Sequence, residues 1–326
     1  MYACSPTWED YWISRDGLKR VLEVLAPSII PASPRGRVLL NEGLHFTGGE
    51  PFLNYHLLLE AVRLAEEMGY PSVFAETNCY WCVSREIVEE RFSELKHAGM
   101  EGVLLSINPF LLERIPFERF KTALSMAEKI FGSNTLVYHD VYKRILEAIN
   151  ARDRMKLDEY LEACRRLGFW TIEASFNPSI LLPMGRLVYS MSSLYRARPA
   201  SEFFHVSCLH ELTRPWHIHV DCYFNYIPGY CAGISLGDAR RLWDWIDGIP
   251  LDEYPVLEAL TSSLEALYKL AREYGYRKRT GYISPCHLCL DVRLYLALNA
   301  KGFSELKPRQ FYEVLCRYIE SLCQQS

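Results

Sequence analysis

The stretch His45–Asn54, HFTGGEPFLN, decides the fold, because it has the composition of a turn between a parallel strand and the helix that follows it. Phe46 ends a short apolar run, and Pro51 suits the first turn of a helix. Between them, Gly48 and Gly49 permit backbone conformations closed to other residues and let a ligand approach the backbone closely. The stretch predicts either a cofactor-holding turn or a plain connecting turn that carries two glycines.

The segments on both sides of this stretch follow one repeating pattern. From about residue 44 to about residue 176, short β-like runs alternate with amphipathic helical stretches, as is typical of βα units around a parallel sheet. Helical segments close on a glycine and lead directly into a strand-like run: AEEMGY into PSVFAET, LKHAGM into EGVLLSI, and CRRLGF into WTIEASF. Glycine is the residue expected at such left-handed helix caps. We therefore expect an α/β fold.

The alternation ends at about residue 177, where prolines become frequent. Residues 217–231, HIHVDCYFNYIPGYC, predict a small hairpin with a Pro-Gly turn, followed by helical stretches to the end of the chain. His217 and His219 alternate on one face of the first strand, and we expect them in the core or on the surface rather than as metal ligands. A second, cysteine-rich α+β module is therefore expected, with domains at 1–200 and 201–326.

Composition narrows the classes of function. The 326 residues carry a net charge of -4, which gives no electrostatic case for nucleic acid. No apolar run approaches the ~20 residues of a membrane-spanning helix, and the opening MYACSPTWEDYW has neither the basic nor the apolar region of a signal peptide. We expect a cytoplasmic protein that binds neither nucleic acid nor membranes. Its eleven cysteines favour metal or redox chemistry over a disulfide framework.

Polar residues lie at the ends of the predicted strands, and their order along the chain bears on the role of the glycine turn. Glu76-Thr77-Asn78 ends one strand and Ser106-Ile107-Asn108 the next, while Pro183-Met184-Gly185-Arg186 follows a later one. With these, Gly48-Gly49-Glu50-Pro51 resembles the motif by which radical S-adenosylmethionine (radical SAM) enzymes bind the amino group of the cofactor's methionine. Alternatively, a Ser or Asn at a strand end simply forms a turn. The resemblance implies cofactor contacts from Thr47, Gly48, Gly49, Glu50, Pro51, Thr77, Asn78, Ser106, Asn108 and Arg186.

Four cysteines form a second constellation. Cys222 and Cys231 flank the Pro-Gly sequence, and Cys286 and Cys289 form a later Cys-x-x-Cys. Four thiolates in two pairs fit tetrahedral zinc or an iron–sulfur cluster, and the spacing does not choose between them. The arrangement resembles the twitch or SPASM domain that holds an auxiliary cluster in some radical SAM enzymes. The alternative is a set of thiols that are close only in sequence.

The chain departs from the family in its cluster loop. Radical SAM enzymes usually bind a four-iron cluster through Cys-x3-Cys-x2-Cys upstream of the glycine motif, where this chain has only Cys4. Cys79 and Cys82 are replacement ligands together with Cys4, a redox pair, or an incidental pair. Since the first strand is also missing, we expect a partial (β/α)6 TIM-like barrel lacking its first strand, from an N-terminally truncated chain.

The resemblance implies a reaction as well as a fold. If a cluster loop exists in the cell, reductive cleavage of S-adenosylmethionine gives a 5′-deoxyadenosyl radical that abstracts hydrogen from a peptide or small molecule, with an electron donor as partner. A second interpretation is a degenerate, non-catalytic barrel that acts as a metal-stabilised binding module. A zinc hydrolase is the third, although no His, Asp and Glu set has the spacing of an open catalytic zinc site.

Overall fold

The computed structural model describes residues 8–31, 36–214 and 216–325. The chain divides into two compact units. We call Leu25–Leu182 the sheet unit, and Met1–Val24 together with Pro183–Ser326 the helical unit. Residues 8–24 thus belong to the same unit as the C-terminal part of the described chain. The domains 1–200 and 201–326 stay a prediction.

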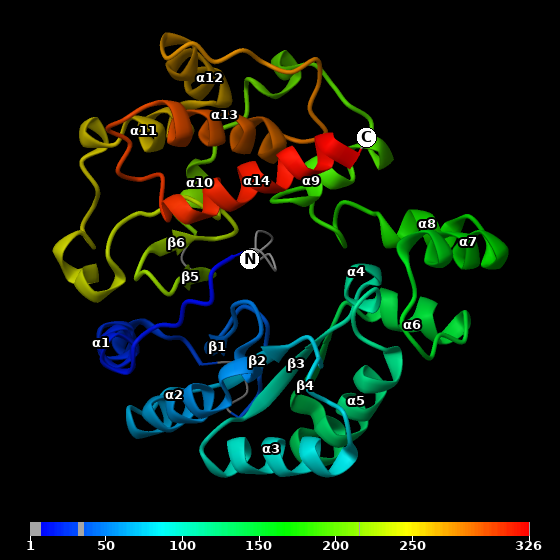
Figure 1. Ribbon diagram of the computed structural model, residues 1–326. Helices are drawn as coiled ribbons and strands as arrows, with labels where there is room; N and C mark the ends of the chain where they lie inside the picture. The colour runs from blue at the N-terminus through cyan, green and yellow to red at the C-terminus, as the bar shows by residue number, and fades with distance from the viewer. Residues whose placement is uncertain (1–7, 32–35, 215, 326) are drawn as a thin grey trace. The chain divides into compact units, whose positions relative to one another are not determined.

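The sheet unit contains a four-stranded parallel sheet with the strands in sequence order, β1-β2-β3-β4 (Figure 1). The strands are β1 (Leu44–Phe46), β2 (Val73–Thr77), β3 (Gly102–Ser106) and β4 (Thr135–Tyr138). Phe46 pairs with Ala75, Thr77 with Leu105, and Ser106 with Tyr138, so the strands end at nearly the same level. The expected α/β fold is confirmed, with β2 and β3 inside the predicted runs PSVFAET and EGVLLSI.

Helices cover one face of this sheet, as Figure 1 shows for α2 (Tyr55–Glu67), α3 (Arg85–His97) and α5 (Phe117–Phe131). Gly69 and Gly99 follow the first two helices with φ values of 72° and 113°, which confirms their predicted role as caps. The remaining helices of the unit are α4 (Pro109–Leu112), α6 (Asp140–Ala148), α7 (Leu157–Leu167) and α8 (Trp170–Ser175).

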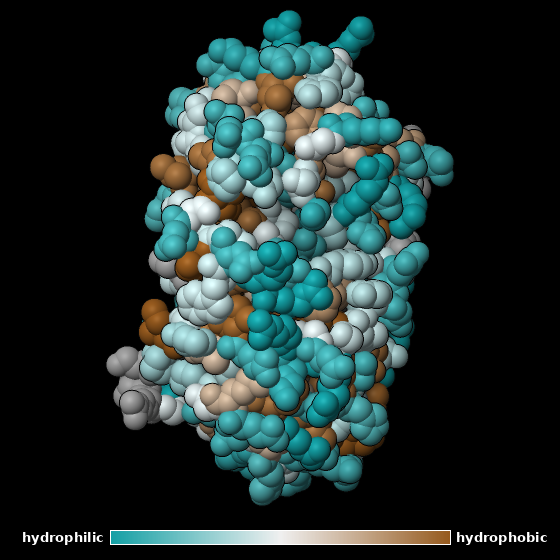
Figure 2. Space-filling model, turned by 90° about the vertical axis from the view of Figure 1, so that its left-hand side faces the viewer, coloured by the Kyte–Doolittle hydropathy of each residue, from teal (hydrophilic) through white to brown (hydrophobic). Residues whose placement is uncertain are grey.

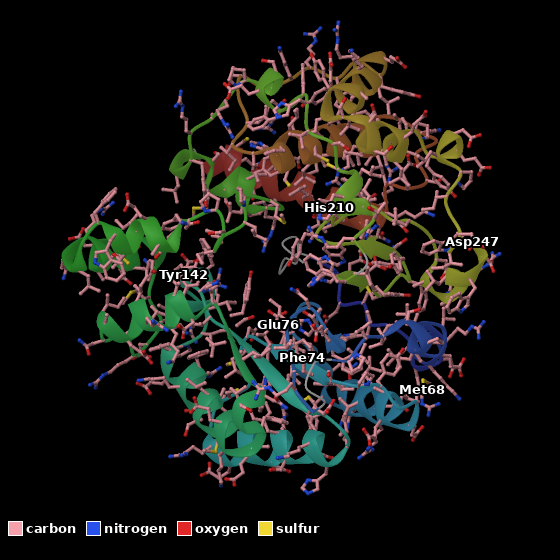
Figure 3. All side chains as sticks on the ribbon, turned by 180° about the vertical axis from the view of Figure 1, so that it is seen from behind. Met68, Phe74, Glu76, Tyr142, His210 and Asp247 are labelled. Carbon is pink, nitrogen blue, oxygen red and sulfur yellow. The ribbon has the colours of Figure 1, made fainter. Side chains whose placement is uncertain are left out.

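A small apolar cluster covers the other face. Val38, Phe74 and Leu104 are buried together, with Leu136 and Tyr138 packed against them. Because side chains alternate along a strand, Phe74 and Glu76 point to the same side of β2. Figure 3 labels both residues in the sheet. The apolar cluster is therefore followed by polar groups where the strands end.

The predicted strand WTIEASF is wrong, because this segment is helix α8. Thr171 and Ser175, four residues apart, are fully buried on one helical face. The Thr171 hydroxyl donates to Cys164 O (2.9 Å), and the Ser175 hydroxyl donates to Thr171 O (2.7 Å). Tyr160 Oη lies 2.6 Å from Ser175 Oγ. Buried hydroxyl groups need hydrogen-bond partners, and the helix supplies them for Thr171 and Ser175. The helix is therefore favoured over a strand, which would lack these partners.

The helical unit consists of helices around one apolar core, together with a two-stranded hairpin. Residues such as Leu267, Leu288 and Tyr312 are completely buried in this core. Its elements are α1 (Arg15–Leu25, whose last residue falls beyond the division), α9 (Leu187–Ser190), α10 (Leu209–Leu212), β5 (Ile218–Val220), β6 (Tyr226–Pro228), α11 (Pro255–Ser262), α12 (Leu264–Glu273), α13 (Pro285–Asn299) and α14 (Arg309–Gln325).

The hairpin is antiparallel, as predicted, but its turn lies elsewhere. Val220 pairs with Tyr226, so residues 221–225 connect the strands and the Pro-Gly sequence follows β6. Asp221 fixes this connection, because its carboxylate accepts the backbone N–H of Tyr223 and of Asn225, both at 2.9 Å. A carboxylate that satisfies several donors of its own turn overrides the Pro-Gly signal.

Hydrophobic residues on the face shown in Figure 2 lie in separate patches among hydrophilic ones. Across the described ranges, we find no helix with the length and apolar character needed to span a membrane.

Candidate cofactor and metal sites

Glu50 joins the glycine turn to the end of β2. Its side chain is 4% exposed and accepts hydrogen bonds from the hydroxyl of Thr77 (2.8 Å), the backbone N–H of Asn78 (2.7 Å) and the backbone N–H of Phe52 (3.2 Å). Burial raises the pKa of Glu50 to about 7, against the lowering effect of these hydrogen bonds. Glu50 is thus a positioning residue, which faces the protein and holds the turn against the sheet.

The turn itself faces open space. A Cβ atom built on Gly48 or on Gly49 would meet no atom within 4 Å. Gly48 has a φ of 147°, which disfavours other residues, whereas the backbone of Gly49 is outside that region. Pro51 begins the 3-10 turn Pro51–Asn54, as its predicted role at a helix start requires. The turn therefore leaves room for a ligand beside Gly49.

A polar layer lies next to the turn, and Glu76 is its centre. Thr47 Oγ1 donates to Glu76 Oε2 (2.9 Å), and the hydroxyl of Ser106 donates to the other carboxylate oxygen. His45 Nε2 lies 3.7 Å from Glu76 Oε2, an ion pair when the imidazole is protonated, and its ring stacks on Phe74 at 4.3 Å. Side chains at the ends of β1 and β3 thus point to one carboxylate on β2, which is partly exposed and has remaining acceptor capacity.

Two predicted contact residues are used as turn formers. Asn78 Oδ1 accepts the backbone N–H of Tyr80 (2.8 Å), and Asn108 Oδ1 accepts those of Phe110 (3.1 Å) and Leu111 (2.9 Å) at the start of α4. These bonds match the alternative that a strand-end asparagine shapes the next turn. Thr77 is buried on the helix side of β2, where it donates to Glu50 and accepts from Trp81 Nε1 (3.0 Å).

Arg186 belongs to the helical unit, unlike the other predicted cofactor residues. Its guanidinium lies over the ring of Tyr318, 5.1 Å from the centroid. The strand that was predicted before Arg186, WTIEASF, is helix α8.

Cys79 and Cys82 lie side by side in the interior of the sheet unit. Both are almost completely buried, and the Cys79 thiol lies 4.0 Å from Thr77 O. Burial, followed by the Cys82 thiol, raises the pKa of Cys79 well above its usual range. Thiols enclosed in the core do not fit the exposed loop of a radical-generating cluster. Cys4, their predicted companion, lies outside the described residues.

In the helical unit, the structure brings together a set of thiols that differs from the prediction by one residue. Burial raises the pKa values of Cys208, Cys231 and Cys286, and the nearby Cys289 thiol raises each of them further. Burial raises the pKa of Cys231 to about 11, and the neighbouring Cys289 adds to the shift. Cys231, Cys286 and Cys289 belong to the predicted set of ligands, whereas Cys208 does not.

These thiols come from three separate segments of the helical unit. Cys286 and Cys289 lie in the first turns of α13, three residues apart and therefore on one face. Cys208 directly precedes α10, and its backbone N–H donates to Leu260 O (2.8 Å) of α11. Cys231 follows β6, with its N–H bonded to Pro228 O (3.0 Å). No spacing rule links Cys208 to the others, because only the packing of α10 on α11 brings it near.

Cys222, the remaining predicted ligand, lies in the hairpin connection beside Tyr223. Cys222 is therefore at the turn end of the hairpin, while Cys231 follows the opposite end. His217 and His219 share one face, as predicted, with their ring centroids 4.8 Å apart. Desolvation lowers the pKa of His217, as does the nearby Arg214.

The donor chemistry of the four thiols suits a soft metal, although they are not preassembled. No group of three or more His, Cys, Asp or Glu side chains in the described ranges is arranged to hold a metal ion. Four thiolates are nevertheless a complete ligand set for tetrahedral zinc or an iron–sulfur cluster.

No model of a known protein family and no curated protein matches this chain. The likeness to radical SAM enzymes therefore rests on the residues and their placement. Two surface pockets lie elsewhere: one beside the hairpin, lined by residues such as Tyr223, Asp238 and Arg309, and one near the amino-terminal ends of the strands, lined by Gly99 and Glu101. Neither of these two pockets includes the glycine turn.

Proposed function

We propose that the chain is a radical SAM-like protein, which binds S-adenosylmethionine at the glycine turn and a metal ion or iron–sulfur cluster on Cys208, Cys231, Cys286 and Cys289. One observation carries the first part: Glu50 fastens the turn to β2 while Gly48 and Gly49 face open space beside the polar layer. A rigid turn with room for a ligand is what recognition through backbone groups requires.

Each part of the cofactor has a suitable neighbour in the sheet unit. The turn backbone is assigned to the amino group of the methionine, as in the family. Glu76 is assigned to the ribose hydroxyls, because a carboxylate at a strand end commonly accepts hydrogen bonds from ribose. Thr47 and Ser106 orient that carboxylate by donating to one oxygen each.

The sheet also supports a finer description of the fold. Strands that follow each other in sequence order, all parallel, form a sector of a (β/α) barrel, whereas a doubly wound sheet reverses its order at a switch point. We assign the sheet unit to a partial barrel of the (β/α)6 kind and the helical unit to a cysteine-rich α+β module.

The chemistry of the family depends on a second group. With a four-iron cluster bound, S-adenosylmethionine supplies hydrogen abstraction from a peptide or small molecule. Because the buried Cys79 and Cys82 do not fit such a cluster, we derive no step through it. Their enclosure in the core favours a second candidate function, a metal-stabilised module that binds the nucleoside without radical chemistry.

The cofactor proposal is tested by Gly49→Leu. A Cβ atom at Gly49 has open space within 4 Å and the backbone lies outside the left-handed region, so we expect the leucine side chain to extend into the space assigned to the ligand. We expect affinity for S-adenosylmethionine, measured by isothermal titration calorimetry, to fall at least about tenfold, a cost of about 1.4 kcal/mol.

The control for this variant is Leu53→Ala. Leu53 lies in the adjacent 3-10 turn and is 61% exposed, so its truncation should leave both the circular dichroism spectrum and the affinity unchanged. Wild-type affinity in a folded Gly49→Leu protein would refute the site.

The metal proposal is tested with three serine variants. Cys208→Ser and Cys231→Ser should each reduce the zinc or iron retained per chain after anaerobic reconstitution, because each removes one of four thiolates. Cys222→Ser is the matched control and should retain the wild-type amount. Acid-labile sulfide distinguishes a cluster from zinc. Metal loss in Cys222→Ser with none in Cys208→Ser would restore the set predicted from sequence.

A further inference from the structure

The pocket beside the hairpin lies wholly within the helical unit and is separate from both proposed sites. Its volume is about 420 Å³, within the ~300–1,000 Å³ typical of sites for small molecules. Its walls come from the hairpin connection at 223–225, from residues 235–238, from the segment 304–310 that leads into α14, and from Tyr254 before α11. We call this space the hairpin cavity.

Hydrogen bonds tie the walls of the hairpin cavity to one another. The backbone N–H of Ser235 donates to Glu305 O (2.8 Å), and the buried Glu305 carboxylate accepts the backbone N–H of Val256 (2.8 Å) in the first turn of α11. On the hairpin side, the N–H of Ala239 donates to Phe224 O (2.8 Å). Walls that are fixed in this way give a preformed site, which favours ligand binding.

Lys307 gives the cavity an available positive charge. Two other charged residues of the lining already have partners: Asp238 Oδ2 lies 2.6 Å from Arg240 Nη2, and Arg309 Nε lies 3.0 Å from Glu313 Oε1. Lys307 is exposed and forms no ion pair with any residue that the structure describes. The cavity can therefore offer this ammonium group to an anion.

The cavity also offers a hydrogen-bond acceptor and a flat ring. Asn225 is 7% exposed, and its Nδ2 donates to Asp221 Oδ2 (2.9 Å). Because an ionised carboxylate only accepts, this bond fixes the orientation of the amide, and no described group donates to Asn225 Oδ1. A buried acceptor normally has a donor, which a ligand can supply. Tyr254 stacks on no ring in the described ranges.

We infer that the hairpin cavity binds a small organic phosphate whose flat ring carries an amino group, the chemistry of a nucleoside monophosphate. Lys307 pairs with the phosphate, because a lysine beside the start of a helix suits this anion. The amino group donates to Asn225 Oδ1, and the ring lies against Tyr254. This inference does not depend on the proposed radical SAM-like function.

Isothermal titration calorimetry of the full-length chain with AMP and with CMP tests the inference, since both bases carry an amino group. Lys307→Met should weaken binding at least about tenfold, the loss expected for one hydrogen bond between charged groups. Lys307→Arg keeps the charge and should lose less. Lys301→Met is the matched control, because Lys301 is exposed in the same unit but does not line the cavity.

Adenosine separates the role of the phosphate from that of the ring. Without a phosphate, it should bind at least about tenfold more weakly than AMP, and Lys307→Met should leave its affinity unchanged. Tyr254→Leu should weaken both ligands, because it removes the ring on which the base stacks. Equal affinities for AMP and adenosine would overturn the role of Lys307.

Gly49→Leu shows which of two sites a nucleotide occupies, because the glycine turn is the proposed site of another nucleoside. AMP affinity should be unchanged in this variant. A loss in Gly49→Leu with none in Lys307→Met would place AMP at the turn and overturn the inference. A wild-type chain that binds neither AMP nor CMP would overturn it as well, and would leave the S-adenosylmethionine site to its own test.

Discussion

Glu50 illustrates how a motif residue can serve its site without touching a ligand. Its carboxylate receives three donors from the protein, two of them at the end of β2, and is almost completely buried. Burying a carboxyl group disfavours its charged form, which is why its pKa rises to about 7 despite these hydrogen bonds. The burial that lets Glu50 hold the glycine turn in place is therefore also the cause of its raised pKa.

This link predicts a pH dependence of stability. Between its unfolded pKa of 4.5 and its folded pKa of about 7, Glu50 holds its proton in the folded state and loses it in the unfolded state. The free energy of unfolding therefore falls as pH rises through this window, by about 3 kcal/mol in total, and is level above it. The glutamine in Glu50→Gln does not titrate. In urea denaturation, the free energy of unfolding of the wild type minus that of Glu50→Gln should therefore be smaller at pH 8 than at pH 5.

A stability difference that is the same at both pH values would contradict this prediction. It would mean that the hydrogen bonds from Thr77 and Asn78 outweigh burial and keep Glu50 ionised throughout.

At the scale of elements, α8 is a segment whose residues favour a strand but whose hydrogen bonds require a helix. The run WTIEASF has the β-branched and aromatic residues of a strand, yet Thr171 and Ser175 find their partners only in a helix next to α7. Ser175 joins three aromatic and polar groups, since Tyr142 Oη also donates to its backbone oxygen (2.7 Å). The element is thus fixed by buried hydroxyls that a strand would leave unsatisfied.

Ser175→Ala tests this explanation. It leaves the fully buried Tyr160 hydroxyl without the Ser175 hydroxyl, 2.6 Å away, which should lower the free energy of unfolding by about 1–3 kcal/mol. Adding Tyr160→Phe removes the stranded hydroxyl, so the double variant should lose less than the sum of the two single losses. Strictly additive losses in chemical denaturation would show that the two hydroxyls do not depend on each other.

At the scale of the whole molecule, two units carry two separate candidate sites. The cofactor turn belongs to Leu25–Leu182, and the four thiols to Pro183–Ser326. Ligand binding stabilises the part of a protein that contacts the ligand. Each ligand should therefore act on its own unit.

Hydrogen exchange measures this separation. S-adenosylmethionine should slow exchange in residues 44–54 and 76–79, and Zn(II) should slow it in residues 206–212, 229–234 and 284–293. Cys208→Ser should abolish only the effect of Zn(II), and Gly49→Leu only that of the cofactor. If S-adenosylmethionine slowed exchange in the thiol segments and not at the turn, its site would lie in the helical unit, which would contradict the proposal.

The sequence by itself determined the features that depend on neighbouring residues. The glycine turn, β2, β3, the glycine caps and the existence of the hairpin follow from local conformational preference and from apolar runs that must be buried. The polar strand ends Glu76 and Ser106 were also predictable, because parallel strands bring their carboxyl ends to one edge.

Only the tertiary structure decided the features that depend on distant partners. WTIEASF is a helix because its buried hydroxyls have hydrogen-bond partners there, such as Tyr160. The hairpin turn lies at residues 221–225 because the Asp221 carboxylate accepts backbone N–H groups of that segment. Cys208 joined the thiols through packing of α10 on α11. Burial and hydrogen bonding act between segments far apart in the chain, so no spacing along the sequence encodes them.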